Sequence, residues 1–263
     1  MIGLLGLLAC APVPGPTAPQ SDALATGQWV WSAKDLPLLA AGRASGRDFA
    51  AGVHIATVHY TDGAFVNELA LSPGVVEPGV PLALVVRLDD SVNESWSRRS
   101  VAEIESGLDA ALGRTLGLVH DADVDYTEVQ IDYDVPVAHL AGWATVVEGL
   151  RASSLRGETV WVTSLVSHLR DPTYGTLFRH VVAGHILQVF DTGDDPVDAG
   201  AVGALAEAAG LPYRLGVGAF ERAGTDHRGW FAKTAEACLR PLCGGVWVFP
   251  AGRPYLDLLG AAP

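Results

Sequence analysis

The chain has 263 residues, of which 49% are hydrophobic and 18% are charged. This composition excludes a disordered protein, and the length suits a single large domain with a sizeable core. The 30 acidic residues outnumber the 17 basic ones, which gives a formal net charge of −13. Because the sequence also has no basic stretch, this charge argues against binding to nucleic acid or, through charge, to anionic lipid.

The first residues are typical of a targeting segment. An apolar run over residues 2–9 ends in Leu7-Leu8-Ala9-Cys10, which resembles the cleavage box of bacterial lipoprotein signals. That resemblance implies that Cys10 is lipidated and becomes the first residue of the mature protein. No Lys or Arg precedes the run, in departure from the pattern. An ordinary apolar start with a buried Cys10 is the alternative.

Residues 11–27 are rich in Pro, Ala, Gly, Ser and Thr and show no periodicity, which is typical of a solvated linker. The chain therefore divides into a signal segment (1–10), a flexible linker (11–27) and a domain (28–263). Together these features predict an exported lipoprotein that only its lipid anchors to the membrane, on the periplasmic or cell-surface side.

Short apolar runs alternate with helical stretches along the domain. The predicted strands are Gln28–Ser32, Gly52–Tyr60, Leu82–Leu88, Thr127–Asp134, Val160–Leu165, His185–Asp191, Tyr213–Phe220 and Gly245–Phe249. The predicted helices are Ser100–Leu116, Val137–Arg151, Tyr174–Val182 and Asp198–Ala209. This alternation predicts a parallel sheet, and eight strands predict a single α/β domain with a (β/α)8 barrel that is irregular in its first units. An open doubly wound sheet is the alternative, although its Gly-rich first turn is missing from the sequence.

In such a barrel, functional side chains collect at the carboxyl ends of the strands. Trp31 ends the first predicted strand, and we place it at the mouth of the barrel, where aromatic rings stack on the apolar faces of sugars. Trp29, like most strand aromatics, is expected in the core. Arg87 and Asp89 share a face near the end of the third strand, which predicts an internal ion pair or, alternatively, a ligand-binding pair.

The fourth predicted strand, Thr127–Asp134, carries the clearest signal for chemistry. Side chains alternate along a strand, so its polar residues share one face, which we expect to point into the barrel. These residues are Gln130, Asp132 and Asp134. Two carboxylates so close together raise the pKa of one of them, which prepares it as a general acid. A solvated strand end is the alternative.

This strand resembles the catalytic strand of the family 18 glycoside hydrolases, the chitinase-like barrels, which reads Asp-Gly-x-Asp-x-Asp-x-Glu and is followed closely by Pro. Asp132 matches the third acid, and Asp134 stands at the place of the general-acid Glu. Thr127 and Gln130 replace the first two acids. The resemblance implies that Asp134 protonates the glycosidic oxygen while Asp132 orients the N-acetyl group of the substrate, which acts as nucleophile.

Three later segments continue the resemblance. Gly184–Gly193 is similar to the sixth strand of that family, with Phe190-Asp191 where Tyr-Asp is usual. Tyr213–Arg222 is similar to the seventh strand, and Gly244–Pro250 to the eighth, with Phe249 at the place of a sugar-stacking Trp. The resemblance implies substrate contacts at Phe190, Asp191 and Phe249. We expect Phe249, like Trp31, at the mouth.

A second resemblance spans residues 28–250. It is to the domain-of-unknown-function family 3142, a group of exported bacterial barrel-like proteins. The matching segments are Trp29-Val30-Trp31, Gln130-Ile131-Asp132-Tyr133-Asp134, Thr163-Ser164-Leu165 and Leu187-Gln188-Val189. His168 replaces a Trp that is usual in that family. Because the family has no established activity, this resemblance implies a fold rather than a function.

Two further features lie near the carboxyl end of the chain. Glu221 follows the seventh strand and offers a second mechanism, in which it acts as nucleophile with Asp134 at a carboxylate separation of about 5–5.5 Å. Cys238 and Cys243 are too few and too closely spaced for a zinc site without a second pair of ligands. Because an exported compartment permits disulfides, we predict that they pair, two free thiols being the alternative.

The sequence thus predicts a glycoside-hydrolase-like protein that acts on an amino-sugar-containing or cell-envelope glycan, with Asp134 as general acid beside Asp132. The alternative is a degenerate barrel that binds such a glycan without cleaving it, because Asp134 is shorter than Glu and Phe190 lacks a hydroxyl. The predicted substrate contacts are Gln130, Trp31, Gln188, Phe190, Asp191, Glu221 and Phe249. We expect a monomer that needs neither metal nor cofactor.

Overall fold

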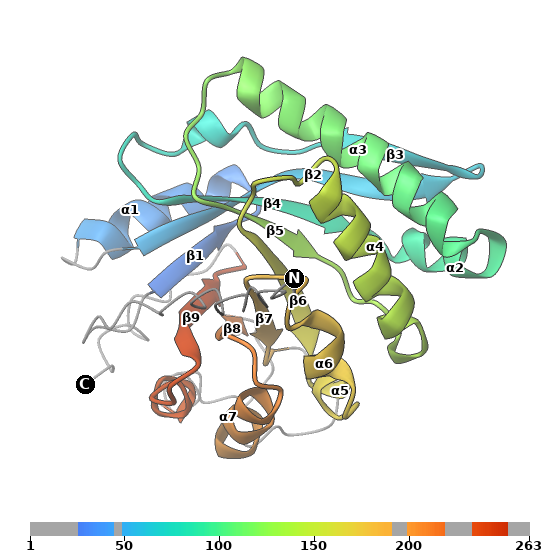
Figure 1. Ribbon diagram of the computed structural model, residues 1–263. Helices are drawn as coiled ribbons and strands as arrows, with labels where there is room; N and C mark the ends of the chain where they lie inside the picture. The colour runs from blue at the N-terminus through green and yellow to red at the C-terminus, as the bar shows by residue number, and fades with distance from the viewer. Residues whose placement is uncertain (1–25, 45–48, 191–198, 219–232, 252–263) are drawn as a thin grey trace, which may run out of the picture.

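The computed structural model describes residues 26–44, 49–190, 199–218 and 233–251 (Figure 1). Eight parallel strands close into a barrel in the order β1-β2-β4-β5-β6-β7-β8-β9, and β9 pairs back with β1. This confirms the predicted barrel and excludes the open sheet. The strands are β1 (Thr26–Val30), β2 (Phe49–Thr61), β4 (Leu82–Leu88), β5 (Glu128–Asp132), β6 (Val160–Leu165), β7 (Gly184–Gln188), β8 (Tyr213–Gly218) and β9 (Cys243–Phe249).

Helices cover the outside of the barrel, with α3 and α4 over one part of the sheet and α5, α6 and α7 over another (Figure 1). The described helices are α1 (Leu36–Ala44), α2 (Ser95–Arg98), α3 (Val101–Asp121), α4 (Leu140–Ala152), α5 (Val166–Leu169), α6 (Tyr174–Phe178) and α7 (Ala199–Ala208). The longest, α3, begins at a capping box in which Ser100 and Glu103 satisfy each other's backbone N–H groups. No described helix combines the length and the hydropathy needed to cross a bilayer.

The first units of the barrel differ most from the prediction. β2 extends beyond the barrel and forms an antiparallel hairpin with β3 (Ala64–Leu69), a strand that the sequence analysis does not include. The two residues of the turn, Asp62 and Gly63, have φ values of 53° and 79°. An Asp-Gly pair between strand-forming residues is the usual signal for such a turn. β3 packs against α3, where the Asn67 side chain donates to the Ala111 carbonyl at 2.7 Å.

β1 also begins earlier than the predicted domain boundary, inside the segment 11–27 that composition marks as a linker. Thr26 and Gly27 pair with both β2 and β9. The reason for glycine at this point is steric, because a Cβ on Gly27 would collide with the indole ring of Trp247. Gly27 therefore leaves room for Trp247 inside the barrel, although glycine is also a typical residue of linkers.

The barrel separates two cores. Outward residues of the strands pack under the helices in the larger core, which includes Val129, Ile131 and Tyr133 of the β5 segment. The inner core fills the barrel with the side chains of Trp29, Ala83, Val85, Trp161, Ile186 and Trp247. The face of β5 expected to be polar points inward, as the alternation of side chains predicts.

A polar chain crosses the inner core. Near the amino ends of the strands, both terminal nitrogens of Arg214 donate to the Glu128 carboxylate, and the longer of the two hydrogen bonds is 2.8 Å. The guanidinium lies 3.8 Å from the centre of the Trp161 ring. Gln130 donates to Glu128 at 2.8 Å and accepts from the indole N–H of Trp29 at 2.8 Å. This chain fixes Trp29 from below.

Cys238 and Cys243 form the disulfide that the sequence predicts, with their Cα atoms 5.2 Å apart. The bridge holds the first residue of β9 to the segment before it.

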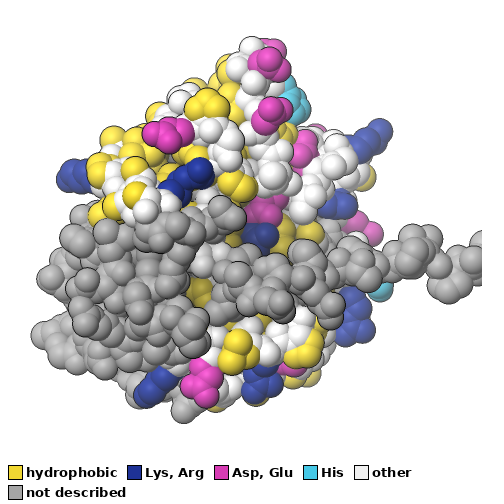
Figure 2. Space-filling view, turned by 90° about the vertical axis from the view of Figure 1, so that its left-hand side faces the viewer, with side chains coloured by type: hydrophobic (Ala, Val, Ile, Leu, Met, Phe, Trp, Pro, Cys, Tyr) yellow, Lys and Arg dark blue, Asp and Glu magenta, His cyan; other side chains and the backbone are white. Residues whose placement is uncertain are grey.

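On the face of the molecule in Figure 2, acidic and basic side chains of the described residues stand mostly singly among hydrophobic ones.

A serine and a histidine lie side by side in the outer core. Ser164 Oγ is 2.7 Å from His185 Nδ1, and both residues are fully buried, which closes this pair to any substrate. Burial lowers the pKa of His185 to about 3, and the nearby His168 adds to this effect. The folded state therefore keeps His185 neutral where an exposed histidine would accept a proton.

We expect the protein to lose stability as the pH falls from about 6.5 towards about 3. Over this range the His185 side chain binds a proton in the unfolded chain but stays neutral in the folded one. At roughly 1.4 kcal/mol per pH unit, this loss is about 2 kcal/mol between about pH 7 and pH 5. His185→Asn should make the dependence less steep, with the buried His54 and His168 supplying the rest, whereas His180→Asn, at an exposed position, should leave it unchanged. Urea unfolding over this pH range measures both, and equal slopes in all three proteins would contradict the assignment.

Gln130→Leu should destabilise the fold by roughly 2–4 kcal/mol, because it leaves the Trp29 N–H buried without its acceptor and removes one of the two hydrogen bonds to Glu128 Oε1. Gln188→Leu is the matched control, since it removes a single hydrogen bond nearer the surface. Urea unfolding followed by tryptophan fluorescence measures the difference. A Gln130→Leu protein as stable as the parent would show that the polar chain does not support the barrel.

Candidate functional site

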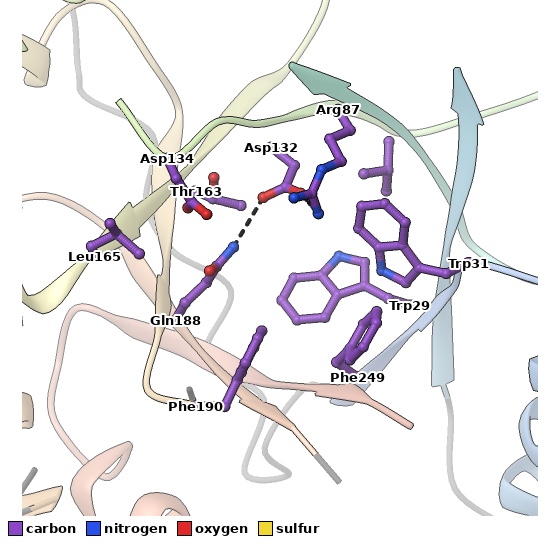
Figure 3. Close-up of a pocket in the computed structure, with 11 residues that line it drawn as sticks. Trp29, Trp31, Arg87, Asp132, Asp134, Thr163, Leu165, Gln188, Phe190 and Phe249 are labelled. Carbon is purple, nitrogen blue, oxygen red and sulfur yellow. Dashed lines mark hydrogen bonds and ion pairs between the residues drawn. The ribbon is translucent and has the colours of Figure 1, made fainter. Parts of the chain in front are cut away.

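A pocket of about 320 Å³ lies at the carboxyl ends of the strands (Figure 3). One wall is aromatic and contains Trp29, Trp31, Phe190 and Phe249. The other wall is largely polar and contains Arg87, Asp132, Asp134, Thr163 and Gln188. The pocket is thus at the end of the barrel where the site is expected from the sequence. Six of the residues predicted for substrate binding or catalysis line it, namely Trp31, Asp132, Asp134, Gln188, Phe190 and Phe249.

The aromatic wall is built from three strands. Trp29 belongs to β1, Trp31 and Phe190 follow β1 and β7, and Phe249 ends β9. The Trp31 and Phe249 rings meet edge to face at 5.6 Å between centroids, and the Phe190 and Phe249 rings stack at 5.9 Å. Trp31 and Phe249 lie at the mouth, as predicted, whereas Trp29 is 4% exposed and forms the floor. Such a wall suits the apolar face of a sugar ring.

Asp132 is buried at the end of β5 and is held from three sides. Gln188 Nε2 donates to Asp132 Oδ1 at 2.9 Å, the dashed line in Figure 3. The Thr163 hydroxyl also donates to the carboxylate. Arg87 Nη1 lies 3.7 Å from Asp132 Oδ2. Burial raises the pKa of Asp132, and these three groups oppose the rise by stabilising its charge.

Asp134 is two residues further along the same segment and lies in a different environment. It is accessible from the pocket, and its carboxylate makes no hydrogen bond with any described residue. Its pKa is raised to about 6, chiefly because the pocket walls displace water from the carboxylate and next because Asp132 carries a like charge. Asp90 adds to the rise, while Arg87 opposes it. Two neighbouring carboxylates in such different environments are the arrangement expected of an acid and its partner.

Arg87 has a different partner from the one that the sequence predicts. It does not pair with Asp89, because β4 ends at Leu88 and Asp89 caps the short helix η3 (Asp90–Glu94) instead. The Asp89 carboxylate accepts from the Ser91 N–H at 3.0 Å. Arg87 points into the pocket (Figure 3), directly beside Asp132 in the register of β4 and β5. The strand alternation thus gives the correct face for Arg87 and the wrong partner.

Gln130 does not contact the pocket, in contrast to its predicted role as a substrate contact. Only 1% of it is exposed, and Trp29 and Glu128 occupy both ends of its amide. The pattern correctly identifies it as an inward polar residue, but its side chain ends beneath the Trp29 floor. Gln130 is therefore a positioning residue for the aromatic wall.

His168 is a positioning residue that the sequence analysis does not assign. The Leu165 N–H donates to His168 Nδ1 at 3.1 Å, so the proton of the ring is on Nε2, which donates to the Val135 carbonyl at 2.7 Å. This bridge ties the end of β6 to the residue after Asp134. Burial lowers the pKa of His168, in keeping with the neutral ring. The substitution of His168 for a family tryptophan is the one sequence signal that points to it.

Gln188 and Phe190 line the pocket, as predicted. Asp191, Glu221 and Cys10 lie outside the described residues, so the alternative pairing of Glu221 with Asp134 has no structural description. The roles of these three residues remain predictions from the sequence.

Comparison with known proteins adds the fold but no family. No protein-family model matches the chain, so membership of family 3142 stays a prediction, and no curated protein matches its sequence. A chitinase from Chromobacterium violaceum superposes with a TM-score of 0.66 at 13% identity, over 91% of this chain and 98% of that one. A chitinase from Rhizomucor miehei gives 0.60 at 13% identity, over 90% and 98% of the two chains. The spore cortex-lytic enzyme SleL of Bacillus cereus gives 0.55 at 11% identity, over 91% of this chain and 74% of its own. The chain therefore has the same barrel fold as these three proteins.

Proposed function

We propose that this protein is a glycoside hydrolase that cleaves a glycan containing N-acetylated amino sugars, with Asp134 as the general acid. The observation that carries the proposal is the contrast between two carboxylates in one pocket. Asp132 is buried and held by Arg87, Gln188 and Thr163. Asp134 is accessible and has a pKa of about 6, so it is protonated in mildly acidic solution.

In the proposed mechanism, Asp134 donates its proton to the glycosidic oxygen as the bond from that oxygen to the anomeric carbon breaks. The carbonyl oxygen of the substrate's own N-acetyl group attacks the same carbon, and water later opens the cyclic intermediate. Asp132 accepts a hydrogen bond from the N–H of that group and balances its positive charge. Gln188 and Thr163 fix Asp132 in this orientation.

The shape of the pocket supports a sugar as its occupant. A sugar ring has apolar C–H faces and a rim of hydroxyl groups. The aromatic wall would take a C–H face, while Gln188 and the two carboxylates would bind the rim. The names of the structural neighbours, two chitinases and a spore cortex-lytic enzyme, agree with an amino-sugar polymer as substrate.

Binding without cleavage is the second candidate function, and two observations favour it. Asp134 is shorter than the Glu of the family 18 pattern by one carbon–carbon bond, about 1.5 Å. A misplacement of about 1 Å can cost roughly a hundredfold in rate. Phe190 reaches the pocket without the hydroxyl that a tyrosine would provide to hold the N-acetyl carbonyl.

We also propose that the protein is exported and anchored by a lipid on Cys10. The box Leu7-Leu8-Ala9-Cys10 supports this location, and a disulfide between Cys238 and Cys243 is compatible with it. An envelope location would give the pocket access to envelope glycans.

Asp134→Asn should lower the rate at least a hundredfold, because the amide has no acidic proton to give to the leaving oxygen. Release of reducing ends from chitin oligomers, peptidoglycan and neutral polysaccharides by the full chain measures this. Asp125→Asn is the matched control, since Asp125 is exposed in the loop before the same strand. If no substrate is cleaved and Asp134→Asn equals the parent, binding replaces catalysis as the function.

Above about pH 6 the rate should fall about tenfold per pH unit, because only protonated Asp134 is an acid. Asp90 raises the pKa of Asp134 through its charge, so Asp90→Asn should move the fall to lower pH. The pH dependence of kcat/KM for parent and variant measures this shift. A profile that Asp90→Asn leaves in place, or one that rises through pH 6, would contradict the assignment of the acid.

A further inference from the structure

Arg87 is the one basic side chain among the described residues that line the pocket. Its guanidinium points into the cavity between Asp132 and Trp31 (Figure 3). The side chain is 40% exposed, so a ligand can reach it. In the proposed mechanism for a neutral glycan, this cation stabilises the charge of Asp132 but makes no contact of its own with the substrate.

The contacts of Arg87 leave its donors available. A guanidinium has five N–H donors, and the contact of Arg87 with Asp132 is a single one at 3.7 Å, beyond hydrogen-bond length. Gln188 and Thr163 already donate to that carboxylate. Trp31 supports the guanidinium, whose carbon lies 5.5 Å from the centre of the ring. The cation is thus held in place while no described residue uses its hydrogen-bond donors.

A second arginine in the same barrel shows how the fold builds a purely structural ion pair. Arg214 grips Glu128 with two nitrogens, and both side chains are mostly buried. Arg87 differs from Arg214 in distance, in the number of contacts and in exposure. Neutralising Asp132 therefore does not account for its geometry.

Arg87 also works against the proposed acid. Its positive charge lowers the pKa of Asp134, whereas a general acid benefits from a raised pKa. A cation at this position is useful if it binds a part of the ligand that Asp134 does not contact. While Asp134 is protonated, Asp132 and Arg87 balance each other, so an anionic group can enter without meeting net negative charge.

We propose that Arg87 binds a carboxylate of the substrate, so that the pocket selects glycans with an acidic substituent at or next to the amino sugar. Arginine pairs with carboxylates through two parallel hydrogen bonds, which gives geometric selectivity as well as affinity. The carboxylate can belong to a lactyl ether on an amino sugar or to a neighbouring uronic acid. The inference deepens the proposed function and rests on the same pocket.

Binding to the non-cleaving Asp134→Asn chain tests this inference apart from hydrolysis. Calorimetry would compare four tetrasaccharides: alternating N-acetylglucosamine and N-acetylmuramic acid, the same compound with amidated carboxyls, alternating N-acetylglucosamine and glucuronic acid, and N-acetylglucosamine alone. We expect the free-acid form of one acidic compound to bind about tenfold or more tightly than its uncharged counterpart. Which compound shows this preference identifies the source of the carboxylate.

Arg87→Gln in the same background should abolish the preference, and Arg87→Lys should restore part of it, because lysine keeps the charge without the two-pronged geometry. Arg98→Gln is the matched control at an exposed position on α2. If Arg87→Gln does not fold because Asp132 loses its cation, Arg87→Gln with Asp132→Asn provides the same comparison without that charge.

Equal affinity for charged and uncharged compounds, or no binding of any, would overturn the inference even where the parent chain cleaves a neutral glycan. A preference that survives Arg87→Gln would overturn it too. Conversely, a preference that depends on Arg87 in a chain that cleaves nothing would support the carboxylate site and refute only the hydrolase. The two proposals therefore fail separately.

Discussion

Charged side chains inside the barrel must be paired or hydrogen-bonded, and β5 with the residues that follow it carries three of them. Every second residue of its segment points inward, namely Glu128, Gln130, Asp132 and Asp134. A carboxylate in an apolar interior is costly unless it is paired or hydrogen-bonded. Arg214 meets that need for Glu128, and Arg87, Gln188 and Thr163 share it for Asp132. The last carboxylate lies where the strand has ended and the pocket opens, and it is the one whose pKa rises to about 6.

One strand and the residues that follow it thus supply a structural ion pair, a support for the aromatic floor and the two carboxylates of the pocket, in order from the amino ends of the strands to the mouth of the barrel. Gln130 links the first of these to the pocket because it bonds Glu128 below and Trp29 above. The geometry of the aromatic wall therefore depends on a buried network that no ligand touches. His168 has a similar part on the other side, where it ties the backbone after Asp134 to the end of β6.

The likeness to two chitinases and a cortex-lytic enzyme lies in the barrel, at 11–13% identity. What this chain places in its pocket departs from the family 18 pattern at Asp134 and Phe190, and Arg87 gives the pocket a cation that the neutral-glycan mechanism does not use. We read these differences together. On the two proposals above, the shorter Asp134 and the cation of Arg87 would suit a sugar that carries an acidic substituent.

Local pattern was sufficient for much of this molecule. The bounds of β4 and β6 follow from their apolar runs alone, and the inward face of β5 follows from simple alternation. The disulfide follows from two close cysteines in a chain with a signal-like start. These features depend on neighbours in the sequence, which is why they can be predicted without a fold.

Partners that meet across the barrel could not be predicted in this way. Arg87 lies beside Asp132 because β4 and β5 pair in one particular register, although the two residues are far apart in the sequence. Closure of the barrel brings Trp29 of β1 over Gln130, and the pairing of β5 with β6 brings His168 within reach of the Val135 carbonyl. The sequence by itself determined the barrel and the two carboxylates of the site. Only the tertiary structure decided which carboxylate is held and which is available, because that depends on the side chains that closure of the barrel brings around each of them.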